Sequence, residues 1–134
     1  MTGVQTCALP ISALYRAGVP IVLGTDANQS PGVPANVPYG ESVHRELELL
    51  VGAGLTPAEA LHAATGAAAD RFGLRDRGRI AAGLRADLLL VGGDPTTAIT
   101  STRSILAVRL AGKAGASGGA GTPGKAGPSV EAGA

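Results

Sequence analysis

The stretch VPIVLGTDA, residues 19–27, decides the fold expected for this chain. A short apolar run rich in β-branched residues ends at a glycine and is followed by a threonine and a carboxylate. This order is typical of a buried parallel strand that presents a functional side chain at its C-terminal end. The pattern therefore predicts a strand over 19–25 and makes Asp26 the first candidate for a functional residue.

The two ends of the chain are expected to contribute nothing to the fold. Residues 1–12 resemble the translation of a sequencing adaptor and are set aside, as a tag would be, so that the true N-terminus is taken to be missing. The single cysteine, Cys7, goes with them, and no disulfide framework is predicted. Residues 112–134 are almost entirely small or polar and are expected to be disordered. The informative part is therefore 13–111.

Charge and hydropathy exclude several classes of partner. The chain has 11 basic and 10 acidic residues, so its formal net charge is +1. This balance gives no electrostatic reason to expect a nucleic acid or an anionic membrane as partner. No apolar run approaches the roughly 20 residues that span a bilayer. A cytoplasmic location is the default expectation.

Two helices are predicted after the strand. Residues 41–53 carry apolar side chains at helical spacing, with charged residues on the remaining faces. The second helix has a complete start signal, because Thr56 stands at the N-cap, Pro57 at the first helical position and Glu59 three residues after the cap. It is expected to continue to about Phe72.

The period of the apolar residues changes after this helix. Short strands separated by glycine-containing turns are predicted at 79–80, 86–91 and 105–110. The informative part therefore divides into an α/β part, residues 13–72, and a small β module, residues 73–111.

Three side chains are candidates for chemistry. A carboxylate at the end of a buried strand, such as Asp26, is a suitable oxygen ligand for zinc or another divalent metal; on this motif alone, an Asx turn or a cap for the following loop is the more common alternative. The pair Glu41 and His44 has the spacing used in di-iron carboxylate bundles, but the sequence has no second pair, and an exposed histidine near Glu48 is the simpler interpretation. His62 is interpreted as structural or exposed.

Several stretches together resemble the C-terminal part of the metal-dependent amidohydrolase superfamily, closest to its imidazolonepropionase-like and prolidase-like members. They occur in the family's order and span about 19–110. The matching stretches are GTD at 24–26, ELELLVGAGLTPAEAL at 46–61, AT at 64–65, GRIAAGLRADLLL at 78–90 and GDP at 93–95.

The resemblance implies an α/β fold, namely the C-terminal part of a TIM (β/α)8 barrel, with 19–25 as its last strand, plus part of a small β-sandwich domain. It implies that Asp26 contacts the active-site metal, expected to be zinc with one or two ions in the whole protein, and that it takes a proton from the metal-bound water. His44 becomes a candidate substrate-binding residue, because it lies near the start of the helix after loop 28–40. Asp87 belongs to a structural signature of the β module and has no catalytic role.

The resulting hypothesis is a metal-dependent hydrolase of C–N bonds in an amide, a cyclic amide or a dipeptide, other than in proteins, with a small-molecule substrate as its partner. The family's His-x-His pair does not occur in this sequence, and a catalytic zinc needs about three protein ligands. The chain by itself is therefore expected to be inactive. The alternative is a non-catalytic helical and β interaction module. The sequence does not predict the oligomeric state.

Overall fold

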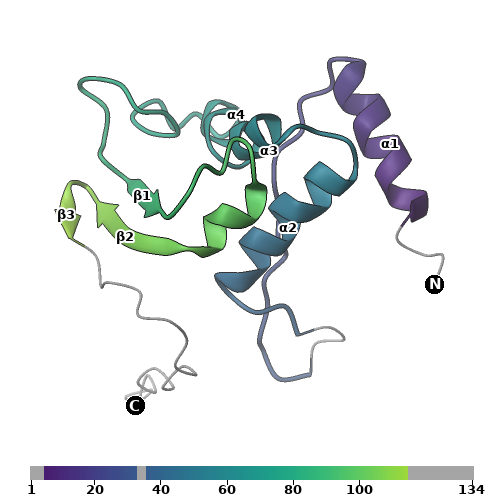
Figure 1. The fold of residues 1–134 in the computed structure, drawn as a ribbon, viewed down its shortest axis with the longest axis horizontal. Coiled ribbons are helices and arrows are strands. Elements are labelled where there is room, and N and C mark those ends of the chain that lie inside the picture. Colours follow the sequence, from purple (N-terminus) through teal and green to yellow (C-terminus); the bar gives the residue numbers. More distant parts are fainter. Residues whose placement is uncertain (1–4, 33–35, 115–134) are drawn as a thin grey trace, which may run out of the picture.

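The computed structural model describes residues 5–32 and 36–114. Helices cluster on one side of the molecule and a three-stranded sheet lies on the other (Figure 1). The elements are, in order, α1 (Gln5–Arg16), α2 (Glu41–Gly52), α3 (Pro57–Ala64), α4 (Gly66–Arg71), β1 (Leu88–Val91), the 3-10 helix η1 (Ile99–Arg103), β2 (Ile105–Leu110) and β3 (Lys113–Ala114). A mixed α/β fold with a small sheet is therefore confirmed. The expectation of a disordered tail falls, for 115–134, outside the described residues.

Helix α1 crosses the boundary that the sequence suggested at residue 12. It runs without interruption from Gln5 to Arg16 and includes Pro10. Ile11 and Tyr15 pack against the hydrophobic core, and Ser12 is buried. The adaptor origin of residues 1–12 stays a prediction, but in this fold the end of that segment is part of the packed structure.

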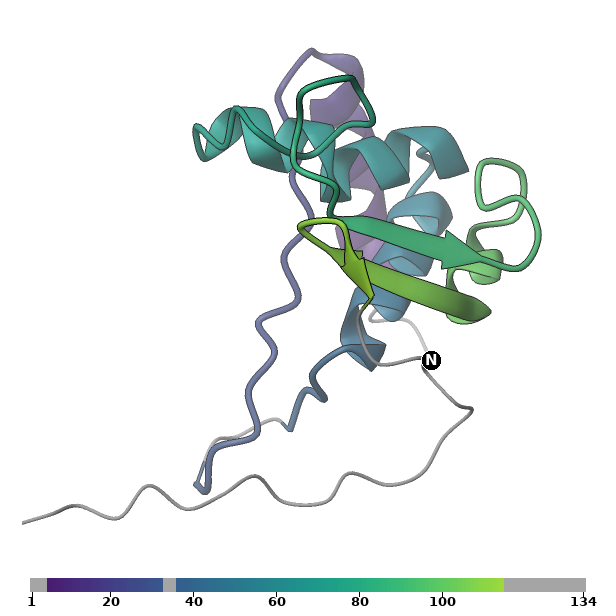
Figure 2. The same cartoon turned by 90° about the vertical axis from the view of Figure 1, so that its left-hand side faces the viewer.

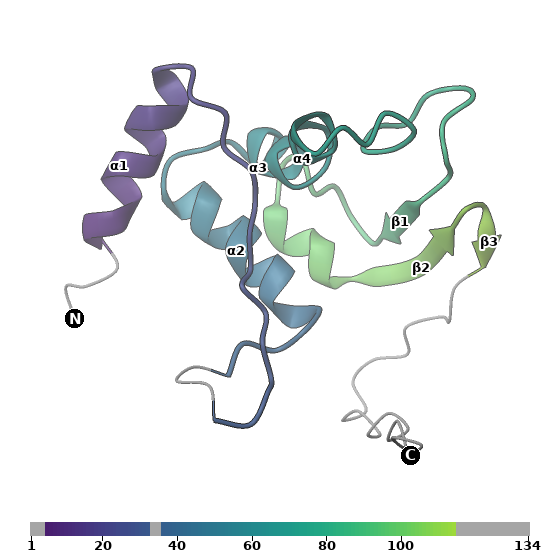
Figure 3. The ribbon, with the colours of Figure 1, turned by 180° about the vertical axis from the view of Figure 1, so that it is seen from behind.

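The predicted strand over 19–25 is not formed. Residues 19–27 are coil, and Figure 3 shows them as a single unpaired stretch between α1 and the loop before α2. Two backbone hydrogen bonds join it to the helices: the Val19 N–H donates to the Leu14 carbonyl oxygen at 3.0 Å, and the Leu23 N–H donates to the Ala63 carbonyl oxygen at 3.1 Å. A parallel strand needs neighbouring strands for its backbone hydrogen bonds, and no described strand lies beside this one. Ile21 and Leu23 still pack against the core, so the apolar pattern is satisfied without a ladder.

The helix start at Thr56 is confirmed in detail. The Thr56 hydroxyl accepts from the Glu59 N–H at 3.3 Å, and the Glu59 carboxylate accepts from the Thr56 N–H at 2.7 Å. This reciprocal pair satisfies two N–H groups that a helix end otherwise leaves without partners. Local sequence alone is enough to specify such a start.

The single helix expected from Thr56 to about Phe72 is wrong, because it is divided into α3 and α4 at Thr65. The Thr65 backbone leaves the helical region (φ −126°, ψ −88°), and its hydroxyl donates to the Leu61 carbonyl oxygen at 2.7 Å. The loop at Gly78 packs into this junction, so closely that a Cβ on Gly78 would lie 2.4 Å from the Ala69 Cβ. The break thus accommodates a segment distant in sequence.

One hydrophobic core joins the helices to the β module. It consists of Leu47, Leu50, Leu55, Ala60, Ala63 and Ile99. Ile99 comes from η1, beyond the predicted boundary at residue 72, so the helical and β parts share a core in this structure. The division into two domains stays a prediction. None of the helices in the described part is both long and apolar enough to cross a membrane.

The sheet is antiparallel, in the order β1-β2-β3. Figure 2 shows β1 and β2 lying beneath α3 and α4. Strands were expected at 86–91 and 105–110, where β1 and β2 lie, whereas residues 79–80 form no strand. Lys113–Ala114 pair with the end of β2, so the predicted tail from residue 112 begins too early. All three leucines of β1 are exposed, and Leu90 is 59% accessible.

Candidate functional site

Asp26 stands at the end of the coil segment, where its carboxylate is exposed. Its backbone is in the left-handed region (φ 49°), which non-glycine residues adopt rarely and aspartate more often than most. No hydrogen bond or ion pair joins its side chain to another described residue. A strained backbone that holds an unpaired carboxylate is characteristic of functional positions. The left-handed conformation and the lack of a protein partner are compatible with a role toward a ligand.

His44 lies on α2 and contacts the β module. Its Nδ1 is 3.1 Å from the Thr102 Oγ1, on η1. Thr102 is only 4% exposed, and its hydroxyl donates to the Ile99 carbonyl oxygen at 2.8 Å. His44 lies in the first turn of α2, and its contact with Thr102 was not predicted from the sequence.

Arg103 forms a contact between η1 and α2 that was not predicted from the sequence. Its guanidinium reaches back to α2, where Nε donates to the Glu48 carboxylate at 2.6 Å and Nη1 donates to Glu41. The hydrogen bond from Arg103 is the main cause that lowers the pKa of Glu48, and the two carboxylates raise the pKa of Arg103. Glu41 and Glu48 are seven residues apart and therefore lie on the same face of α2. This spacing is the sequence feature that could have indicated a shared basic partner.

Asp87 has the structural role expected for it. Its carboxylate accepts a hydrogen bond from the Ala111 N–H at 2.8 Å and from the Arg85 Nε at 2.9 Å. Ala111 is the first of the two turn residues between β2 and β3 and has a positive φ of 51°. The hydrogen bond from Ala111 is the largest cause that lowers the pKa of Asp87. The carboxylate therefore holds the strand-to-strand turn.

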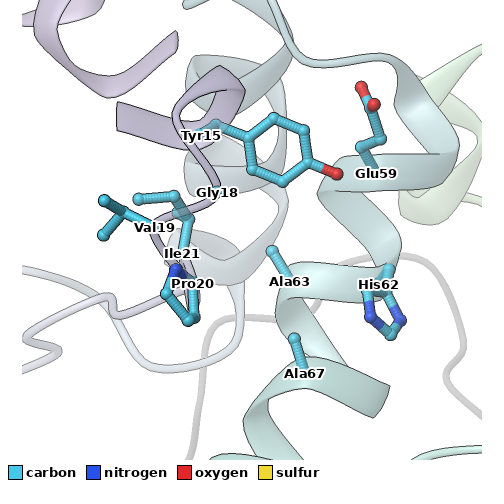
Figure 4. Close-up of a pocket in the computed structure, with 9 residues that line it drawn as sticks. All are labelled: Tyr15, Gly18, Val19, Pro20, Ile21, Glu59, His62, Ala63 and Ala67. Carbon is cyan, nitrogen blue, oxygen red and sulfur yellow. The ribbon is translucent and has the colours of Figure 1, made fainter. Parts of the chain in front are cut away.

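A pocket of about 320 Å³ lies between α1 and α3. Figure 4 shows an apolar wall with the Tyr15 hydroxyl directed toward the side where Glu59 and His62 stand. Burial, followed by the Glu59 carboxylate, raises the pKa of Tyr15. Neither Asp26 nor His44 lines this pocket. The two candidates from sequence therefore do not meet in it.

The described residues do not form a complete metal centre. Within residues 5–32 and 36–114 there is no group of three or more histidine, cysteine, aspartate or glutamate side chains arranged to hold an ion. Asp26 is therefore not part of such a group among the described residues, whereas a catalytic zinc requires about three protein ligands. The residues that the structure describes thus do not by themselves fit a catalytic divalent metal.

Comparison with known proteins identifies the family of this chain. A sequence model described as "Amidohydrolase family" matches residues 3–116. Since this match covers most of the sequence, the chain belongs to the amidohydrolase family.

Individual proteins of known name are similar to this chain. The chain is 43% identical over 86 residues to an imidazolonepropionase of Cereibacter sphaeroides, covering 64% of this chain and 20% of that protein. It is 38% identical over 110 residues to an imidazolonepropionase of Deinococcus radiodurans, covering 78% and 26%. A Xaa-Pro dipeptidase crystal structure with bound methionine matches with a TM-score of 0.71 and 27% identity, over 83% of this chain and 25% of that chain. The chain thus spans only a fifth to a quarter of the length of these relatives.

Proposed function

We propose that this chain is part of a metal-dependent hydrolase that cleaves C–N bonds in a small amide, cyclic amide or dipeptide. The observation that carries the proposal is the family match over residues 3–116, supported by imidazolonepropionases among the relatives. A dipeptidase among the similar structures supports a substrate of the same bond class. The match does not favour the alternative of a non-catalytic interaction module. The proposed fold of the whole protein is a TIM barrel with a small β-sandwich domain.

Asp26 is the proposed catalytic carboxylate. It is exposed, has no partner among the described side chains and is held in a left-handed backbone. A carboxylate in this state can take a proton from an attacking water and pass it to the leaving nitrogen. Its lack of an ion pair with a described residue supports this role, because both carboxylate oxygens remain able to accept hydrogen bonds from a ligand.

A divalent metal, zinc in our proposal, belongs to the whole protein rather than to this chain. Asp26 is the one ligand that we propose from this chain, and further ligands would come from the sequence that its relatives have in addition. His44 is proposed to contact the substrate, and the loop over 28–40 to shape specificity. The chain alone is accordingly expected to lack hydrolase activity.

A chimera tests the proposal. The segment of the Cereibacter sphaeroides imidazolonepropionase that aligns with this chain is replaced by the chain's own residues, and hydrolysis is measured with imidazolonepropionate, a simple cyclic amide and a Xaa-Pro dipeptide. We expect turnover of at least one of these substrates. In the same chimera Asp26→Asn should lower kcat by about 10²- to 10⁴-fold, the usual contribution of a general base.

The matched control is Asp94→Asn, the same change of carboxylate to amide. Asp94 lies in an exposed turn, where its carboxylate accepts from the Thr96 N–H at 2.9 Å, so the variant should retain full activity. A folded chimera that hydrolyses none of the three substrates would contradict the proposed function. Equal activity of Asp26→Asn and Asp94→Asn would remove Asp26 from the mechanism.

A further inference from the structure

The contact between His44 and Thr102 fixes the position of a proton. The Thr102 hydroxyl has two neighbours, the Ile99 carbonyl oxygen at 2.8 Å and the His44 Nδ1 at 3.1 Å. Thr102 is 4% exposed, so solvent contributes little at this site. A hydroxyl has one proton, which it can give to only one of these two acceptors.

The carbonyl oxygen is the acceptor that the geometry requires. If the hydroxyl donated to His44, two oxygen atoms 2.8 Å apart would face each other without a proton between them, in a buried place where such repulsion is weakly screened. If the hydroxyl donates to Ile99, its own oxygen remains an acceptor. The distance of 3.1 Å then fits an N–H group of His44 donating to Thr102.

Neutral histidine has one N–H, and the hydrogen bond at one ring nitrogen decides the state of the other. We infer that Thr102 is a positioning residue that holds neutral His44 in the Nδ1–H tautomer and leaves the Nε2 lone pair as an acceptor. Nε2 would then accept a hydrogen bond from a donor group of the substrate, such as an amide N–H. This role toward the substrate rests on the proposed function, whereas the tautomer does not.

A second contact keeps Thr102 in place against α2. Its neighbour Arg103 donates to Glu41 and Glu48, which lie on α2 on either side of His44. The Arg103 side chain of η1 therefore joins two residues of α2 that flank the histidine in the helix sequence. This arrangement restricts the sliding of η1 that would lengthen the distance from Thr102 to His44.

Nitrogen NMR of the full 134-residue chain, at a pH where both histidines are neutral, measures the tautomer directly. We expect the His44 Nδ1 to show the chemical shift of a protonated, pyrrole-type nitrogen, and Nε2 that of an unprotonated, pyridine-type nitrogen. His62, the other of the two histidines, is an internal control, because the hydrogen bond of Thr102 to a histidine ring goes to His44. The opposite assignment for His44 in the wild-type chain would overturn the inference without any variant.

Two substitutions separate positioning from packing. Thr102→Ser keeps the hydroxyl and should keep the Nδ1–H tautomer. Thr102→Val keeps the shape and removes the acceptor, so that His44 should shift toward the Nε2–H form that histidine favours in water, while His62 is unchanged. An unaltered His44 spectrum in a folded Thr102→Val chain would contradict the inference. If this variant does not fold, the wild-type and serine spectra still decide.

The chimera described above tests the consequence for the substrate. There, Thr102→Val should raise KM by about 2- to 10-fold, the loss that corresponds to one hydrogen bond, with a smaller effect of Thr102→Ser. An inactive chimera together with the expected tautomer would count against the proposed function and leave the positioning role of Thr102 intact. The expected tautomer with an unchanged KM in Thr102→Val would instead refute the substrate contact of His44.

Discussion

Gly78→Ala is expected to be strongly destabilising, for two separable reasons. A Cβ at this position would lie 2.4 Å from the Ala69 Cβ and 3.0 Å from the Thr65 carbonyl oxygen, although carbon atoms pack best at about 3.5–4.0 Å. Ala69 is buried on α4 and its methyl group has no other rotamer to adopt. Gly78 also has a φ of +88°. We expect a loss of about 1–2 kcal/mol from the backbone and about 1–3 kcal/mol from overpacking, roughly 2–5 kcal/mol in all.

Gly83→Ala is the matched control. Gly83 has almost the same backbone (φ +84°), but nothing lies within 4 Å of a Cβ placed on it. Urea unfolding followed by circular dichroism should therefore show only the backbone loss for Gly83→Ala and an additional loss of about 1–3 kcal/mol for Gly78→Ala. At an unchanged slope of about 1 kcal/mol/M, the two midpoints should differ by about 1–3 M. Equal midpoints would refute the close packing of the Gly78 loop against the junction of α3 and α4.

Three further outcomes are expected. Thr56→Ala should lower the free energy of unfolding by about 1 kcal/mol, measured by the same urea titration, because it removes the acceptor for the Glu59 N–H; an unchanged midpoint would contradict the importance of the capping box. The fold lowers the pKa of Asp87 from the ordinary value of 3.8, mainly through the hydrogen bond from the Ala111 N–H. The ionised carboxylate therefore stabilises the folded chain above about pH 4, and this contribution is lost as the pH falls through the pKa of the folded state. Urea midpoints of Asp87→Asn should consequently fall less between about pH 5 and about pH 2 than those of the wild type, and parallel curves would show that the turn at Ala111 does not depend on the charge. The chain alone should bind zinc weakly in equilibrium dialysis, since Asp26 is the one ligand proposed, and tight stoichiometric binding would mean that other residues complete a site.

Features encoded by neighbouring residues were predictable from the sequence. The capping box needs only Thr56 and Glu59, and the apolar spacing of α2 places Leu47 and Leu50 in the core. These signals depend on helical geometry, which is fixed within a few residues. The start of α3 and the extent of α2 could therefore be derived without knowledge of the rest of the fold.

Features that depend on distant partners could not be derived in this way. The apolar run at 19–25 has the composition of a strand, but without a neighbouring strand it remains coil. The division of the second helix at Thr65 depends on the approach of Gly78, which no local pattern announces. The contact of His44 with Thr102 joins residues 58 positions apart. The choice of Asp26 as the catalytic carboxylate stays a prediction, because the described residues place no ligand or second functional group against it.

The outer edge of β1 has a consequence for the protein in concentrated solution. β1 pairs with β2 on one side, and no described strand pairs with its opposite edge. Its four residues, LLLV, include no charge and no proline, the features that normally prevent sheet edges from joining. Two copies can therefore extend each other's sheets through backbone hydrogen bonds, and such association should increase with protein concentration and weaken when Leu90 is replaced by lysine.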